Sequence, residues 1–259
     1  RTYSRYDKVP GTSVPASFLM ARLLFLFILI SVGNFFRFIF LGVFDLKQIL
    51  LLSMFPIGAA LIFFIQKWLA KRDTTYIPLN EVKGEWNTTI YNRLAGRKMV
   101  YKGQKKVGEY KRFYFKWWQK IVNDVLEGNG TWYLNLSFIS PDEEKIDIVE
   151  TKNELFKAYQ EWEVRRDGFI RGKIKTDYSI KNSVKLKEAL ILELGEESYY
   201  YQSYKIGSEI HVLQDGKVIA SGKRSGFFSS TYHFHLQEEK EEHEVFLVLT
   251  YVLFHYVYK

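Results

Sequence analysis

The chain of 259 residues contains no cysteine and carries a net charge of +8, from 37 lysine and arginine residues against 29 acidic ones. The lack of cysteine excludes a thiol nucleophile and is compatible with a reducing compartment. Five of the eight charges belong to residues 1–70, which hold seven basic and two acidic residues. The rest of the chain is therefore nearly neutral, and it is long enough to form one domain with a real core.

Two long apolar stretches, residues 18–44 and 49–69, stand near the N-terminus and are separated by Asp45–Gln48. Each reaches the roughly 20 residues that a helix needs to cross a bilayer. A secretory signal peptide fits poorly, because the two stretches stand in tandem and no small-residue cleavage site follows them. The pattern predicts a transmembrane helical hairpin over residues 17–72, behind an N-terminal arm of residues 1–16.

Two polar residues, Asn34 and Arg37, fall inside the first apolar stretch. Polar side chains within a bilayer are costly and commonly mark contacts with another helix or with a partner protein. We therefore expect Asn34 and Arg37 to take part in a helix–helix contact or a partner contact in the membrane. In an alternative interpretation, the first helix ends near Phe36 and the following residues lie along the membrane interface.

Lysine and arginine flank the hairpin on both sides, whereas the connection between its helices offers only Lys47. The flanking basic residues are Arg1, Arg5, Lys8, Arg22, Lys67, Lys71 and Arg72. Because basic flanks remain in the cytoplasm, the sequence predicts a multi-pass protein of the cell membrane with both termini cytoplasmic. On this topology, the glycosylation-like triplets that begin at Asn87, Asn129 and Asn135 are chance matches.

Beyond the hairpin, short segments of alternating polarity are separated by glycine-containing turns, which is the pattern of antiparallel β-strands. Strands are expected over residues 107–118, 132–138, 169–178, 184–194, 198–204, 209–213, 218–223 and 231–236. Residues 154–163 have helical spacing instead, which is typical of a short surface helix. Residues 73–97 are interpreted as a linker between the hairpin and the domain.

The run from Glu244 to Tyr258 is almost uninterrupted apolar sequence without glycine or proline. Its length is typical of a helix, yet it is too short to span a bilayer. A helix that is apolar on every face must be enclosed, and the acidic residues 238–244 suit its N-terminus. The sequence therefore predicts a mainly β fold, a closed antiparallel barrel around the C-terminal helix 244–258, attached to a membrane anchor.

Several segments resemble a known family. Leu213–Lys223, the aromatic and serine-rich segment Phe227–Phe234, the acidic break and the terminal apolar helix look like the end of the tubby-like superfamily. That superfamily includes the LURP-one-related proteins and the phospholipid scramblases. The turn within Tyr101–Gly108 resembles an earlier part of the same fold. For residues 98–259 the resemblance implies a closed antiparallel barrel of about twelve strands, threaded by the C-terminal helix.

The N-terminal hairpin is a departure from the family pattern. In the scramblases the membrane segment is usually assigned to the final helix, so the resemblance does not carry scramblase activity over to this chain. The lipid-binding basic residues of the tubby proteins have no residue-level match in this sequence either.

No motif in the sequence states an enzymatic activity. It contains no phosphate-binding loop and no nucleophile elbow, so no catalytic residue is assigned and we expect a protein that is not an enzyme. His233 and His235 share one face if they lie in a strand, but they lack a third ligand at a convincing spacing. We therefore expect no metal site and no cofactor.

Residues 93–120 combine ten basic residues with one acidic residue and several aromatic ones. Such a segment binds anionic lipid or nucleic acid, or else forms a solvated strand face over core aromatics. Lipid is favoured over nucleic acid, because the hairpin holds the domain near a membrane. The expected lipid-binding residues are Lys105, Lys106, Lys111, Arg112, Lys116, Trp117 and Trp118.

Together these features predict a non-enzymatic, membrane-anchored protein whose cytoplasmic barrel binds anionic lipid headgroups or a membrane-protein partner beside its own anchor. The alternative is an accessory or regulatory subunit of a larger membrane complex, such as a transporter, a channel or a secretion machine. A lipid scramblase is a less favoured third function. The expected partners are membrane lipids and another membrane protein or a second copy of the chain, but not nucleic acid.

Overall fold

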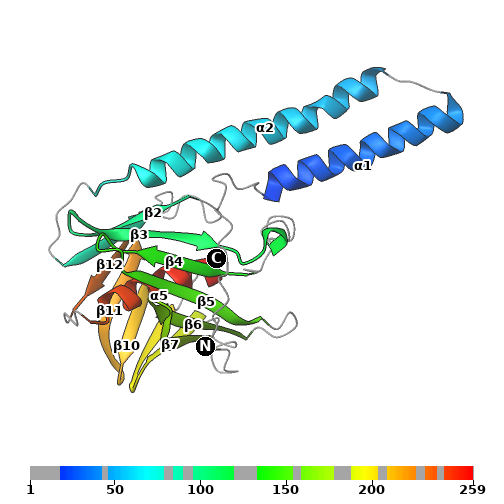
Figure 1. Ribbon diagram of the computed structural model, residues 1–259. Helices are drawn as coiled ribbons and strands as arrows, with labels where there is room; N and C mark the ends of the chain where they lie inside the picture. The colour runs from blue at the N-terminus through cyan, green and yellow to red at the C-terminus, as the bar shows by residue number, and fades with distance from the viewer. Residues whose placement is uncertain are drawn as a thin grey trace.

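A computed structural model gives the structure of the chain, and Figure 1 shows its two parts, a pair of long N-terminal helices and a β-barrel that contains one helix. The residues that it describes are 18–42, 46–78, 84–89, 96–119, 133–153, 159–177, 188–203, 209–225, 231–237 and 242–258. The predicted architecture of an apolar helical hairpin followed by a mainly β domain is confirmed.

The two long helices, α1 (Phe18–Leu41) and α2 (Leu46–Thr74), run in opposite directions. Each contains a stretch that is long and apolar enough to cross a membrane, and most of their large apolar side chains are exposed. Apolar surface exposed over such a length is unfavourable in water and is expected where lipid covers it. By length and composition, the pair can therefore serve as a membrane anchor.

Helix α1 continues without a break through Phe36, so the alternative interpretation with a break at this point is wrong. The helix ends one residue before Gly42, whose φ of +63° is the left-handed conformation that favours glycine. Its N–H donates to the carbonyl of Phe38 at 2.9 Å, which satisfies one of the free carbonyls at the helix end.

Twelve strands form one closed antiparallel barrel, in which every strand pairs with its neighbours in sequence and β1 pairs with β12. The strands are β1 (Glu85–Thr89), β2 (Lys98–Lys102), β3 (Lys105–Phe113), β4 (Asn135–Ile139), β5 (Lys145–Asn153), β6 (Gln160–Arg166), β7 (Phe169–Thr176), β8 (Glu188–Leu194), β9 (Glu197–Ser203), β10 (Ile210–Gln214), β11 (Lys217–Arg224) and β12 (Thr231–Leu236). Because the barrel is closed, none of these strands presents a free edge.

Two expectations about the strands differ from the structure. Residues 73–97 were interpreted as a linker, but they contain β1, which pairs with both β2 and β12 and so closes the barrel. The short helix expected over residues 154–163 is wrong where the structure describes it, because residues 160–163 begin strand β6. Trp162 and Val164 are buried whereas Glu163 and Arg165 are partly exposed, which is the alternation of a strand, and the helical spacing of the apolar residues is coincidental.

The simple up-and-down order gives the two ends of the barrel different characters. At one end, here called the turn end, the strands are joined by the short connections 103–104, 140–144, 167–168, 195–196 and 215–216. At the other end, the loop end, lie the longer connections, including residues 114–134 between β3 and β4. The chain enters the barrel at the turn end, where Glu85 begins β1 and where the ring of Tyr76 packs against Tyr101.

Helix α5 (Glu244–Val257) runs through the barrel from the turn end to the loop end (Figure 1). All its residues except Val245 and Val257 are buried, which confirms the predicted enclosed helix. The hydroxyl of Tyr201 donates to the carbonyl of Leu247 at 2.9 Å, and that of Tyr258 donates to the carbonyl of Ala189 at 2.5 Å. These bonds fix the position of the helix along the barrel axis.

The closest approach between wall and helix requires a glycine. A Cβ atom at Gly222 of β11 would lie 2.2 Å from the ring of Tyr251, closer than any real contact. The aromatic ring therefore occupies the space that a side chain at this position would fill. The serine–glycine step in the segment Lys217–Arg224 is thus explained by the packing of the barrel around α5.

Two of the three glycosylation-like triplets lie within the wall. Asn87 belongs to β1 and Asn135 to β4, and both side chains are buried. A glycan cannot be attached to a buried side chain of a closed wall, so these two triplets are chance matches, as expected. Asn129 lies outside the described residues.

The enclosure of α5 can be tested with Leu249→Asp. Leu249 is 1% exposed, so the substitution places a carboxylate without a partner in the core, at a cost of several kcal/mol against a total stability of about 5–15 kcal/mol. We expect the cooperative thermal transition of the barrel, followed by circular dichroism in detergent, to be lost. Val218→Asp is the control, because Val218 lies on the surface of β11. An unchanged transition for Leu249→Asp would contradict the enclosed helix.

Candidate functional site

The residues expected to bind lipid do not form one surface. Lys105 and Lys106 begin β3 at the turn end, whereas Lys116, Trp117 and Trp118 follow the last residue of β3 at the loop end. A strand rises about 3.4 Å per residue, so the nine residues of β3 separate the two groups by about 27 Å. The two groups are close in sequence, but the extended strand places them at opposite ends of the barrel.

Arg112 differs most clearly from its predicted role. It shares the inward face of β3 with the core residue Tyr110, and it is buried beside the ring of Tyr114, with 5.2 Å between the guanidinium carbon and the ring centre. Arg112 therefore does not face a lipid surface. Lys111 points to the outer face of the same strand and is partly exposed.

On the outer face of β3, part of the basic charge of this segment is neutralised. Glu109 forms ion pairs with Arg97 at 2.9 Å and with Lys106 at 3.6 Å. Lys105 is exposed at the start of β3. Ion pairs at an exposed surface contribute little to stability, but they reduce the positive potential of the surface. This group of bases is therefore a weaker anion site than the sequence indicated.

At the loop end, residues Phe113–Gln119 form a compact structure, here called the aromatic turn. The side-chain oxygen of Gln119 accepts hydrogen bonds from the backbone N–H groups of Phe115 and Lys116, both at 3.0 Å. The ring of Trp118 packs edge-on against Tyr133, with 5.5 Å between the ring centres. Trp117 is 68% exposed. The predicted strand over residues 107–118 ends at Phe113, and this turn takes its place.

The aromatic turn also carries a cation. The amino group of Lys116 lies 5.7 Å from the ring centre of Trp118, within the range of a cation–π contact. Phe115 packs edge-on against Phe113, with 5.4 Å between the ring centres, and remains 40% exposed. The sequence pattern indicated the lysine and the tryptophans but not Phe115, which fell inside the expected strand 107–118, nor Gln119, whose role depends on its hydrogen bonds to the backbone.

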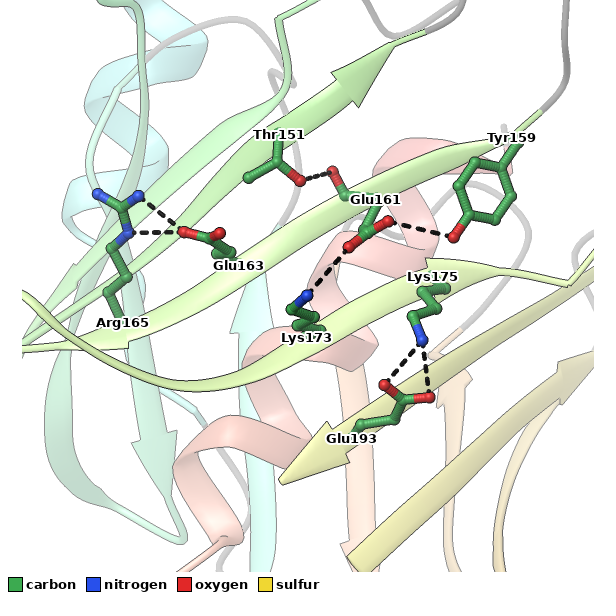
Figure 2. A network of polar contacts seen from close by, with 8 residues as sticks. All are labelled: Thr151, Tyr159, Glu161, Glu163, Arg165, Lys173, Lys175 and Glu193. Atoms are coloured by element: carbon green, nitrogen blue, oxygen red, sulfur yellow. Dashed lines mark hydrogen bonds and ion pairs between the residues drawn. The ribbon is translucent and has the colours of Figure 1, made fainter. Parts of the chain in front are cut away.

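A further basic stretch follows at residues 165–187, and four of its described basic residues, Arg165, Arg166, Lys173 and Lys175, are paired with acidic residues. Figure 2 shows side chains from β5 to β8 on the outer face of the wall, with α5 behind. The ion pairs drawn there join Arg165 to Glu163, Lys173 to Glu161 and Lys175 to Glu193. The hydrogen bond that Lys175 donates to Glu193 raises the pKa of Lys175. The two cross-strand pairs, Lys173–Glu161 and Lys175–Glu193, support the sheet. Together with the pair within β6 they reduce the positive potential of this face.

A cluster of polar residues surrounds the start of α5. The amino group of Lys102 donates to Glu244 at 2.7 Å, and the carboxylate of Glu244 is buried. The hydroxyl of Tyr199 donates to Glu197 and lies 2.8 Å from Nδ1 of His243. Burial, and secondly the hydrogen bond to Glu197, raise the pKa of Tyr199. Each of these contacts ties the helix start to β2 or β9, so the cluster is explained as the seat of α5.

His233, considered above as a metal ligand, has other contacts. Its Nε2 is hydrogen-bonded to the hydroxyl of Ser225, and its Nδ1 lies 3.2 Å from a carboxylate oxygen of Glu85. This order of groups resembles a hydrolase relay, but Ser225 is exposed at the surface, where water competes for every charge that a reaction would develop. Among the described residues, no three metal-binding side chains gather.

In the membrane anchor, Arg37 lies in the last part of α1. Its guanidinium donates to the side-chain oxygen of Gln48 at 3.3 Å, and Gln48 belongs to the first turn of α2. Arg37 thus contacts the second helix near the closed tip of the hairpin. Asn34 is half-buried one turn earlier in α1. Whether either residue also contacts a partner stays a prediction.

The fold and its surface define a class of protein, a helix-filled antiparallel barrel carried on an apolar helical hairpin. The family model for the Tubby C-terminal like domain matches residues 97–259. The chain therefore belongs to this family, as its resemblance to the tubby-like superfamily predicted. Strand β1 and the helical hairpin lie outside the matched residues. No curated protein and no solved structure gives a significant match.

The seat of α5 can be tested at Lys102. The variant Lys102→Met leaves the buried carboxylate of Glu244 without its cation, and we expect a loss of about 1–3 kcal/mol in the free energy of unfolding. Adding Glu244→Gln removes the stranded charge, so the double variant should be more stable than Lys102→Met alone. Thermal melts of the three proteins in the same detergent measure this. Equal melting of the wild type and Lys102→Met would show that the pair contributes nothing.

Proposed function

We propose that this chain is a non-enzymatic, membrane-anchored binding protein, whose barrel engages anionic lipid headgroups or a membrane-protein partner beside its own anchor. In this proposal α1 and α2 cross the cell membrane, and both ends of the chain and the barrel lie in the cytoplasm. The supporting observation is that the hairpin, with its exposed apolar surface, is followed closely by the barrel: ten residues separate Thr74 at the end of α2 from Glu85 at the start of β1. The barrel is therefore held at the membrane surface.

Two features support a binding role over a catalytic one. The polar clusters of the described residues are explained by structure, since they seat α5 or pair charges across the wall. Helix α5 fills the barrel, so its interior offers no room for a substrate along the buried length of the helix. The same enclosure argues against the scramblase alternative, because the final helix is not available as a membrane segment in this fold.

The accessory-subunit function remains a second candidate, and one observation favours it. At the tip of the β6–β7 hairpin, Phe169 and Ile170 are 72% and 56% exposed. The tip is held firmly, because Asp167 exchanges hydrogen bonds with the backbone of Lys145 at 2.8 and 3.0 Å. Two large apolar side chains on a rigid tip suit a protein partner. This tip is at the turn end of the barrel.

The proposed topology can be tested with reporter fusions. Because basic residues flank the hairpin on both sides, fusions placed after Arg5 and after Asp73 should both be cytoplasmic. A fusion after Gln48, between the two expected spans, is the control and should be external. An external reporter after Asp73 would exclude a cytoplasmic barrel.

The proposed ligand can be tested by native mass spectrometry of the full-length protein, released from membranes with a mild detergent. We expect anionic lipids to remain bound in excess over their share of the membrane, because the inner leaflet attracts basic groups near its surface. Bound proteins are identified in the same sample. Retained lipid with the bulk composition and no bound protein would count against both candidate functions.

A further inference from the structure

The aromatic turn Phe113–Gln119 has the composition and the exposure that are typical of a membrane-contacting element. Phe115, Trp117 and Trp118 are exposed large aromatic residues grouped in four positions, and Lys116 stands among them. Tryptophan is enriched where a protein meets the headgroup layer, because its ring is apolar and its N–H is polar. A lysine beside it can reach the lipid phosphates.

We infer that the barrel docks on the membrane with its loop end, and that the aromatic turn sits in the headgroup layer next to the anchor. This inference rests on the proposed function and deepens it, since it names the surface and its occupant, the lipid–water interface. It selects Lys116, Trp117 and Trp118 from the seven expected lipid-binding residues. Lys105 and Lys106 then face away from the membrane.

The rigidity of the turn supports this assignment. Gln119 holds the backbone of Phe115 and Lys116, and Gln119 itself donates its N–H to the carbonyl of Lys116 at 3.1 Å. Trp118 is fixed against Tyr133. The exposed ring of Trp117 is thus presented by a preformed support, and little conformational entropy is lost when it enters an interface.

The course of the anchor points to the same end. In Figure 1, α2 lies along the wall beside β2 and roughly in line with α5, and the closed tip of the hairpin extends past the loop end. The apolar span of α2 ends at Ile65, and the nine residues to Thr74 extend about 14 Å further. Thr74 lies near the turn end, because Tyr76 packs on Tyr101.

These lengths place the loop end, and not the turn end, at the level of the membrane border. The roughly 27 Å of β3 correspond to about 21 Å along the axis of a barrel whose strands tilt by 35–45°. The loop end therefore lies within about 7 Å of the level of Ile65, where the apolar span of α2 ends on the side of the barrel. The turn end lies about 14 Å from that level, on the side away from the span.

The charge of the opposite end is the second argument. The described connections of the turn end contain seven acidic residues and neither lysine nor arginine. The acidic residues are Asp142, Glu143, Glu144, Asp167, Glu196, Asp215 and Glu242. Exposed basic residues at the adjoining strand ends, namely Lys105, Lys106, Arg171 and Lys217, offset part of this charge. The negatively charged cytoplasmic leaflet repels the acidic connections. The exposed tip of Phe169 and Ile170 follows Asp167 and Gly168 directly, so it is the weaker candidate for lipid contact.

The test uses the full-length protein in nanodiscs of phosphatidylcholine and phosphatidylserine. Because the chain has no cysteine, Trp117→Cys and Ile170→Cys each create a single site for an environment-sensitive fluorophore. Spin-labelled lipids with the quencher close to the headgroup then report contact. We expect the label at position 117 to lose most of its emission and the label at position 170 to keep it. Quenching at position 170, at both positions or at neither overturns the inference.

A second pair of variants separates the aromatic turn from the other predicted lipid-binding residues. With the fluorophore attached through Lys116→Cys, the added substitution Trp117→Ser should reduce quenching, whereas Lys105→Gln with Lys106→Gln should leave it unchanged. Equal effects of the two changes would contradict the assigned surface. The proposed function is judged separately, because anionic lipid bound to a protein whose position 117 stays in water supports the function and rejects this orientation.

Discussion

The enclosure of α5 is the constraint on which the rest of the molecule depends. A helix with its side chains is about 10–12 Å across, and a wall of twelve strands can close around it only if their inner faces pack against it on every side. Large rings fill most of the space between wall and helix, among them Trp162, Tyr199 and Tyr201. At Gly222 the wall has no side chain, and the ring of Tyr251 occupies the place that one would take. The barrel and the helix therefore specify each other, and neither has a core without its partner.

The enclosure of α5 also requires that the charged groups at the start of this helix be paired. A buried carboxylate such as Glu244 is tolerated only with a cation at hydrogen-bond distance, and Lys102 supplies it from β2. Tyr101, the residue before Lys102, is the one on which Tyr76 packs after α2. The point where the anchor joins the barrel and the point where α5 enters it are thus neighbours on β2.

The sequence predicted those elements whose apolar pattern is strong and local. The two spans and the helix 244–258 are continuous apolar runs. Their lengths indicate whether lipid or protein surrounds each of them: the two long runs can span a bilayer, and the short one cannot. What it missed depends on distant partners. Strand β1 is short and polar in sequence, and it is a strand because β2 and β12 pair with it. Arg112 was expected at the surface, but the alternation set by Tyr110 turns it inward. A charge count along the chain cannot show that β3 carries its two basic groups to opposite ends.

Weak surface contacts are enough for a barrel that is tied to its membrane. Many described bases of the wall are paired with acids, which weakens the positive field that could draw this barrel to lipid from a distance. A free domain that touched the bilayer with only two tryptophans and one lysine would dissociate from it often. The anchor changes this balance, because it makes each contact intramolecular and gives the aromatic turn an effective concentration of the order of millimolar. The hairpin thus supplies residence at the membrane, and the turn needs only to set the orientation of the barrel.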